Sequence, residues 1–293
     1  MSEVLLLVQA VANGLQMGFL YALVAVGLTI IWGLMEMVNF AHGEFLMLGM
    51  IGAWWAAVQF NLDPLLAIVP LGLLLYGLGV LVYTQLMRRV QRGDAFTQIF
   101  ATVGLFFFLQ NAAVAVFTSD FQFVGNTWLA KLSSEHVQLF GLRLGVPLMI
   151  AAGIAMVLFF LLYLLIDRTE FGIALQATSE DREAAMLVGI RPQKMFAVAW
   201  GLGAALVAIA GAILSNFFAV YPQIGIQFTV LAYAIVALGG FGSILGTLMA
   251  GLLVGVVQSV TVLYLPPAFK DAFVFASYLI IGLFRPQGLF GRF

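Results

Sequence analysis

Residues 39–44 form a compact polar cluster between two long apolar runs. The cluster contains Asn39, His42 and Glu44, together with Phe40 and Gly43. Ionisable side chains within membrane-spanning segments are energetically costly and usually face a cavity or a partner. The cluster therefore predicts a break between helices at membrane depth, whose polar side chains line or gate a path.

A structural interpretation of the same cluster also fits its residue types. Asn39 would cap a helix, His42 would bond a freed backbone carbonyl, and Glu44 would lie near the cytoplasmic interface. A role in holding the helix break is compatible with both interpretations.

A second predicted break lies at residues 239–243, in the sequence Gly239, Gly240, Phe241, Gly242, Ser243. Small residues allow a sharp turn and close contact between helices. A half-helix beginning there would also offer free amides to a substrate carboxylate. Tight packing is the interpretation that we favour from sequence.

Ser243 and His42 raise one alternative of another class, an intramembrane serine hydrolase. Nucleophilic catalysis requires the serine and its base within hydrogen-bond reach, with oxyanion donors nearby. The Gly-x-Ser-x-Gly pattern is missing, and His42 has other possible roles. The chain has two histidines and no cysteine, which disfavours a metal centre and excludes thiol chemistry.

Four further polar residues occur in the apolar run near residues 96–118 and would line a passage or form hydrogen bonds between helices: Gln98, Thr102, Gln110 and Asn111. Sequence does not distinguish these two roles.

The elements that must position these residues are membrane helices. The chain has 293 residues, of which 63% are hydrophobic and only 9% charged. Soluble proteins carry about 25% charged residues. The formal net charge of −1 argues against binding nucleic acid. The composition therefore predicts an all-α, polytopic membrane protein forming a single transmembrane domain over residues 1–293.

About 8–9 spans fit the pattern, since a span needs roughly 20 apolar residues. Residues 13–18 interrupt the first apolar run, so we expect an interfacial lead-in and a first span over residues 14–34. Further spans are expected at residues 45–60, 65–87, 96–118 and 146–166. The charge-free run 195–269 would hold about three more, divided at residues 221–222, 239–243 and 266–267, before a short last span at 272–284.

The basic residues predict the orientation, because cytoplasmic loops are enriched in Lys and Arg. One side would carry Arg88, Arg89, Arg92, Arg168, Arg182, Arg191, Lys194, Arg285 and Arg292, and the other only Lys131, Arg143 and Lys270. The first side, including the C-terminus, is therefore expected to be cytoplasmic.

Residues 178–190 predict a short cytoplasmic helix capped by Thr178 or Ser179 and ended by Gly189. Its acidic first turn disfavours anionic lipid and favours docking on a soluble partner. The predicted docking residues are Ser179, Glu180, Asp181, Arg182, Glu183, Ala184, Ala185, Leu187 and Gly189.

Glu183-Ala184-Ala185 followed by Gly189-Ile190 resembles the loop by which permeases of ATP-binding cassette (ABC) importers engage their ATPases. The resemblance extends over essentially the whole chain and is to the bacterial branched-chain amino acid importer permeases, in particular their first permease subunit. It is carried by Gly14-Leu15, Gly18, Tyr21-Ala22-Leu23, Gly27, Asn39 to Glu44, Leu109-Gln110-Asn111, Leu238 to Ser243, Gly246 and Arg285 to Leu289.

The resemblance implies an inner-membrane permease with no enzymatic activity or cofactor of its own. The expected partners are a second homologous permease, a periplasmic binding protein and two cytoplasmic ATPases that hold ATP and Mg. Consistently, the sequence has no G-x-x-x-x-G-K-[ST] phosphate-binding loop. Importers of urea, short amides and other amino acids in the same family remain alternatives. A channel or secondary carrier is disfavoured because most carboxylates lie in loops or at span ends.

Overall fold

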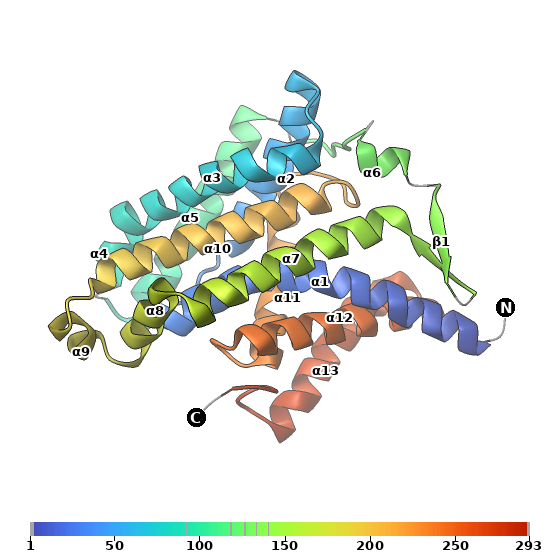
Figure 1. Ribbon diagram of the computed structural model, residues 1–293. Coiled ribbons are helices and arrows are strands. Elements are labelled where there is room, and N and C mark those ends of the chain that lie inside the picture. Colours follow the sequence, from blue (N-terminus) through green and yellow to red (C-terminus); the bar gives the residue numbers. More distant parts are fainter. Residues whose placement is uncertain are drawn as a thin grey trace.

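The computed structural model describes residues 3–291, apart from residues 92, 118, 126, 133 and 140. Helices dominate it (Figure 1). The longer ones are α1 (Glu3–Met35), α2 (His42–Phe60), α3 (Pro64–Val82), α5 (Ala95–Val116), α7 (Val146–Arg168), α10 (Pro192–Leu214), α11 (Ile224–Gly239), α12 (Ile244–Tyr264) and α13 (Lys270–Phe284). A π-helical turn (Tyr83–Met87) and α4 (Arg88–Val90) extend α3, and α8 (Glu170–Glu180) and α9 (Arg182–Leu187) follow α7.

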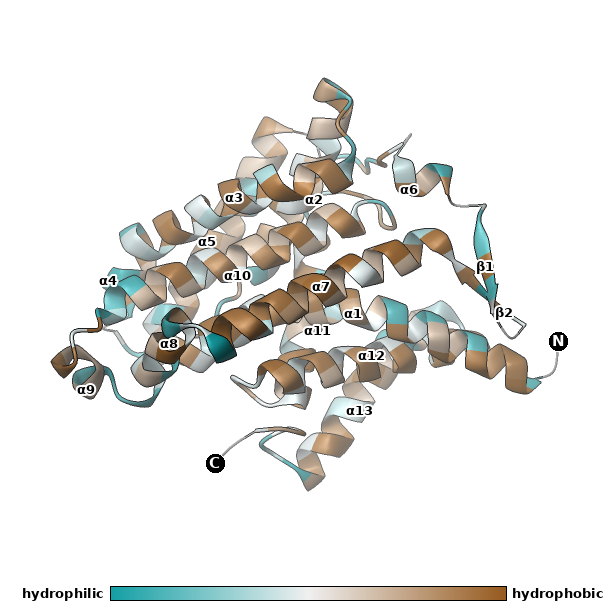
Figure 2. Ribbon diagram, viewed as in Figure 1, coloured by the Kyte–Doolittle hydropathy of each residue, from teal (hydrophilic) through white to brown (hydrophobic). Residues whose placement is uncertain are grey.

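Within the described residues, seven helices are long and apolar enough to cross a membrane, and α11 is a shorter apolar helix. The long helices are brown along most of their length in Figure 2, whereas hydrophilic colour gathers near α4, α8 and α9 and on the hairpin. These features confirm the predicted all-helical, multi-pass membrane fold.

Helix α1 lies at the centre of the bundle and contacts α7, α10, α11 and α12. It is one continuous helix of 33 residues, so the predicted interruption at residues 13–18 is wrong. The glycines there serve packing instead. A Cβ atom on Gly14 would lie 2.7 Å from the Val256 Cα, and one on Gly18 would lie 2.7 Å from the Leu252 Cα, so α1 and α12 meet backbone to backbone.

Both predicted helix breaks are present. The chain leaves helical geometry after Met35 and re-enters it at His42, so α2 begins inside the polar cluster. The second break separates α11 from α12 at residues 240–243. Glu36 adopts a positive φ of 53°, and Gly240 and Gly242 adopt φ values of 99° and 79°. Glycine allows the second break to turn without the strain that a Cβ atom would add.

The two ends of the bundle differ. Helices α4, α8 and α9 gather at one end, and the N-terminus lies at the other (Figure 1). Near the N-terminus the connection after α5 forms α6 (Trp128–Lys131) and a hairpin of β1 (His136–Leu139) and β2 (Leu142–Gly145), which sequence did not predict. Arg92 and Arg292, used in the orientation argument, lie outside the described residues.

The predicted helix at 178–190 is two helices, so its predicted start and cap are wrong. Thr178 is buried inside α8 and donates its hydroxyl hydrogen to Ala174 O, and Ser179 Oγ donates to Gln176 O. Asp181 is the N-cap residue of α9, where its Oδ1 accepts from the amides of Glu183 and Ala184. Gly189 follows α9 with a φ of 88°, as expected of a helix-ending glycine.

Candidate functional site

The segment from Glu36 to Glu44 is fastened to three helices. His42 Nε2 lies 2.8 Å from Val24 O in the middle of α1. The amide of Asn39 donates to the Tyr233 hydroxyl, and the amide of Gly43 donates to Thr229 Oγ1; both acceptors are on α11. On the α5 side, the Thr102 hydroxyl bonds Val38 O. The bonds to the Asn39 and Gly43 amides and to Val38 O satisfy backbone groups that the helix break frees at membrane depth.

The side chains of Asn39 and His42 are therefore packed inside the protein in this structure. Both side chains are about 1% exposed. Asn39 Oδ1 accepts from Ala41 N, but the N-cap position of α2 is Ala41, so the helix-capping role considered for Asn39 is wrong. The carbonyl that His42 bonds belongs to a continuous helix, so it was not freed by the break.

Glu44 is fully buried between α2 and α11, which corrects the expectation that it lies near the interface. Its two carboxyl oxygens have no hydrogen-bond partner among the described residues, and neither has Asn39 Nδ2. A Cβ atom on Gly225 would lie 2.5 Å from Glu44 Oε1, so the absence of a side chain at Gly225 makes room for the carboxyl group. Phe40 is the member of the cluster that is exposed, at 39%.

The break at residues 239–243 is tightly packed and borders a cavity. Gly239 packs against the backbone of Gly246, and Gly240 packs against Gly291 near the C-terminus. Backbone hydrogen bonds from the C-terminal segment also reach the end of α11. Ser243 caps α12 by accepting from the Gly246 amide, 3.1 Å away. The tight-packing interpretation therefore has direct geometric support.

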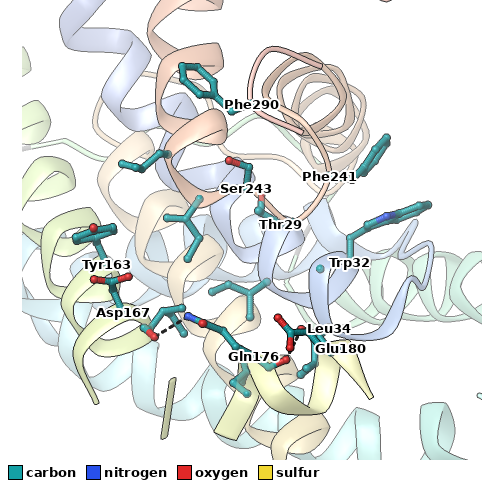
Figure 3. Close-up of a pocket in the computed structure, with 18 of the residues that line it drawn as sticks. Thr29, Trp32, Leu34, Tyr163, Asp167, Gln176, Glu180, Phe241, Ser243 and Phe290 are labelled. Atoms are coloured by element: carbon teal, nitrogen blue, oxygen red, sulfur yellow. Dashed lines mark hydrogen bonds between the residues drawn. The ribbon is translucent and has the colours of Figure 1, made fainter. Parts of the chain in front are cut away.

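A cavity of about 530 Å³, here called the polar cavity, opens beside this break. Figure 3 shows residues of four regions around it: Thr29, Trp32 and Leu34 of α1, Tyr163 and Asp167 of α7, Gln176 and Glu180 of α8, and Phe241 with Ser243 of the break. The Trp32 and Phe241 ring centroids are 4.6 Å apart, and Gln176 Nε2 donates to Ile166 O at the α7–α8 corner.

The polar cavity brings together two groups of residues that sequence treated separately. Ser179 and Glu180, predicted for docking, line it together with Phe241, Gly242 and Ser243 of the predicted break. Glu36 also lines it and was not predicted as a site residue. Any movement of α8 would consequently change the shape of this cavity.

The polar residues of α5 do not gather at one site. Thr102 is buried, while Gln98 Nε2 bonds Gly93 O and Asn111 Nδ2 bonds Phe107 O within or next to their own helix. Gln110 is partly buried. Thr102, through Val38, is the one of the four whose bond reaches another element among those described.

Ser243 and His42 do not form a catalytic pair in this structure. Ser243 Oγ accepts from the Gly246 amide, and His42 Nε2 is bonded to Val24 O. The hydrolase alternative therefore receives no support from the geometry.

Helix α9 presents an apolar surface. Leu187 is 88% exposed and Val188 76%, with Met186 beside them, whereas Ala185 is buried. The Arg182 guanidinium lies 5.0 Å from the centroid of the Phe196 ring, which connects α9 to α10. The remaining predicted docking residues, Asp181, Glu183 and Ala184, are exposed on the same short helix.

Sequence reasoning missed several residues that accept hydrogen bonds from the first helix break and from α1. Tyr233 and Thr229 on α11 hold the first break, and Gln258 on α12 accepts from the Tyr21 hydroxyl on α1 at 2.8 Å. The available signal was a polar group within an otherwise apolar run. In the described part of the chain, no group of three His, Asp or Glu side chains is arranged to hold a metal ion.

Comparison with known proteins places these features in a family. The family model of the branched-chain amino acid transport system permease component matches residues 10–282. The chain is 29% identical to the high-affinity branched-chain amino acid transport system permease protein BraD of Pseudomonas aeruginosa, over 100% of this chain and 98% of the relative. It is 30% identical to LivH of Salmonella typhimurium, a permease protein of the same description, over 99% and 97%. No solved structure matches the chain significantly.

Proposed function

Because this chain belongs to the family of permease components of branched-chain amino acid transport systems, we propose that it is the membrane subunit of an ABC importer for branched-chain amino acids. The relatives BraD and LivH are named permease proteins of high-affinity branched-chain amino acid transport systems, and both are covered over at least 97% of their length. Transport permeases of this family are not enzymes, and the energy would come from separate ATPase subunits that hold ATP and Mg.

The observation that supports an ATPase partner is the apolar tip of α9. Met186, Leu187 and Val188 project from a polar end of the bundle, where exposed large side chains are costly unless a partner covers them. Ala185 and the Arg182–Phe196 contact fix α9 to the body of the protein. A displacement of α9 would therefore be transmitted to α10 and, through α8, to the polar cavity.

Basic residues at the same end of the bundle support an orientation of the chain in the membrane. Arg88 and Arg89 in α4 lie at the end of the bundle that carries α8 and α9 (Figure 1). Under the positive-inside rule this end would face the cytoplasm of an inner membrane, together with the C-terminus. The opposite end, with α6 and the hairpin, would meet a periplasmic binding protein.

A second homologous permease would complete the membrane unit. Residues on α13 such as Leu283 and Phe284 are more than 80% exposed, and α5 also exposes large side chains. These faces would meet either the lipid bilayer or the second permease. ATP-driven closure of the ATPases would then switch the side of the membrane to which the path opens.

The test is uptake of labelled leucine into vesicles by the assembled transporter, comparing the unaltered chain with the double variant Met186→Glu, Leu187→Glu. We expect at least a tenfold loss of uptake, because two carboxylates would have to be desolvated in the docking interface. Gln85→Glu, an exposed position in the π-helical turn that follows α3, is the control for an added charge outside α9.

Unchanged uptake in the double variant would contradict docking through α9. Uptake of urea or a short amide in place of leucine would retain the importer class and overturn the substrate assignment.

A further inference from the structure

Helix α11, which contacts the first helix break, also borders two cavities. A cavity of about 520 Å³, here called the aromatic cavity, lies between α5, α11 and α13. Its lining on α11 follows a helical stripe through Ile226, Val230, Tyr233 and Ala237. Rings from the other elements close it: Phe40, Phe106, Phe107, Phe241, Phe275 and Tyr278. Its chemistry suits an apolar side chain.

A cavity of about 290 Å³, here called the charged cavity, lies at the start of α13. Lys270 and Asp271 line it with Gln258 and Tyr21. The Tyr21 hydroxyl donates to Gln258 Oε1, and Gln258 Nε2 donates to Asp271 Oδ1 at 2.9 Å, which fixes the carboxylate. Lys270 forms no ion pair in the described residues. The cavity thus holds a fixed anion and an unpaired cation, a combination that complements a zwitterion.

The three cavities adjoin one another: two lie along α11, and the polar cavity lies just beyond its C-terminal end. Ile226, Val230 and Phe275 line both the charged and the aromatic cavity. Phe241 lines both the aromatic and the polar cavity. The cavities are therefore arranged in series from Lys270 and Asp271, past the aromatic rings, to the helix break next to α8. Sites of about 300–1,000 Å³ hold small ligands, so each chamber is of the scale of an amino acid.

We propose that the exposed face of α11 forms the translocation path, with Lys270 and Asp271 receiving the carboxylate and ammonium groups of the amino acid and the aromatic cavity receiving its branched side chain. The inference rests on the proposed function and goes beyond it by assigning the path. The polar cavity is the exit chamber, and Phe241 separates it from the aromatic cavity. The cluster of Asn39, His42 and Glu44 then holds the wall of the path rather than lining it.

The test uses single-cysteine variants, because the chain has no native cysteine. Val230→Cys and Ala237→Cys place a thiol on the lining face of α11, and Ala232→Cys places one on the buried opposite face. The variants are assembled with the partner subunits in vesicles and treated with a charged, membrane-impermeant thiol reagent, with and without leucine-loaded binding protein.

We expect both lining thiols to react at least tenfold faster than the thiol at position 232, and leucine to slow their labelling at least threefold. The smaller alanine-to-cysteine change at 237 guards against a folding defect at 230. Equal labelling of all three thiols would overturn the path. Labelling without protection by leucine would also overturn it, because the crevice would then be one that substrate does not enter.

Leucine uptake by the unaltered chain in the same vesicles distinguishes failure of the proposed path from failure of the proposed function. Normal uptake with unprotected lining thiols refutes the path along α11 and leaves the proposed function standing. Absence of leucine uptake by an intact transporter refutes the proposed substrate, and with it the assignment of the aromatic cavity to a branched side chain.

The charged cavity has its own test. Asp271→Asn retains an oxygen that can accept from Gln258 while removing the negative charge, and Lys270→Gln removes the positive charge. Each is expected to lower leucine uptake at least threefold without changing leucine binding to the isolated binding protein. Glu3→Gln, at the exposed start of α1, is the matched control for loss of a surface charge. Uptake at the control level in both cavity variants would overturn the assignment of these two residues.

Discussion

The carboxyl group of Glu44 lies fully buried between two helices, with no hydrogen-bond partner for either oxygen among the described residues. An unpaired charge at membrane depth is costly. The neutral form of the side chain is therefore the one that this environment accommodates. Gly225 provides the space, and Gly43 and Thr229 hold the backbones on each side.

The first prediction follows from this environment. Glu44→Gln preserves the shape of the side chain and carries no charge, so its folding stability should stay within about 1.5 kcal/mol of the unaltered chain. Glu44→Lys should lose folded protein, since a buried unpaired charge costs several kcal/mol. Thermal unfolding in detergent measures both. A loss in Glu44→Gln as large as that in Glu44→Lys would show that the negative charge is required.

The second residue-scale prediction concerns Asp181, whose carboxylate caps α9. Asp181→Ala should destabilise the first turn by about 1 kcal/mol, and Asp181→Asn should retain the cap. Hydrogen exchange at the Glu183 and Ala184 amides should rise in the alanine variant alone. Equal exchange in both variants would mean that the cap does not hold α9.

At the scale of elements, glycine positions set how closely helices approach. A Cβ atom on Gly27 of α1 would lie 2.6 Å from Gly203 O of α10, whereas one on Gly104 of α5 would meet nothing within 4 Å. Gly27 and Gly203 thus let the two most buried spans touch, and Gly104 faces open space.

This contrast gives the third prediction. Gly27→Ala should destabilise the protein by about 1–3 kcal/mol, because backbone atoms on the facing helix cannot yield as a flexible side chain would. Gly104→Ala should be neutral or stabilise the helix by up to about 1 kcal/mol. The comparison requires only thermal unfolding of the two variants under one condition. Equal unfolding temperatures would contradict close packing of α1 on α10.

Span positions were predictable from sequence, because membrane thickness fixes the length of an apolar helix. The span expected at residues 146–166 is α7 (Val146–Arg168), and the one at 96–118 is α5 (Ala95–Val116). The cap of α9 was not predictable, since Thr178, Ser179 and Asp181 are all suitable residue types. The polar cluster was predicted as a path or a helix break, and its pairing with α11 depends on packing between segments almost 200 residues apart.

At the scale of the whole molecule, the bundle has one end with α9 and an adjoining polar cavity, and an opposite end with the hairpin. The charged cavity and the aromatic cavity lie along α11 between these ends, and the polar cavity adjoins the aromatic one at Phe241. This arrangement suits a subunit that receives a solute at one end and energy at the other. We therefore expect the chain to work within an importer that contains ATPases.

The most direct measurement is co-purification of this chain from its native membrane, solubilised in mild detergent, with identification of the proteins that accompany it. We expect recovery of a second homologous permease and of ATPase subunits, with the ATPases lost from the Met186→Glu, Leu187→Glu variant. Recovery of this chain alone, from a preparation shown to be folded, would contradict the account.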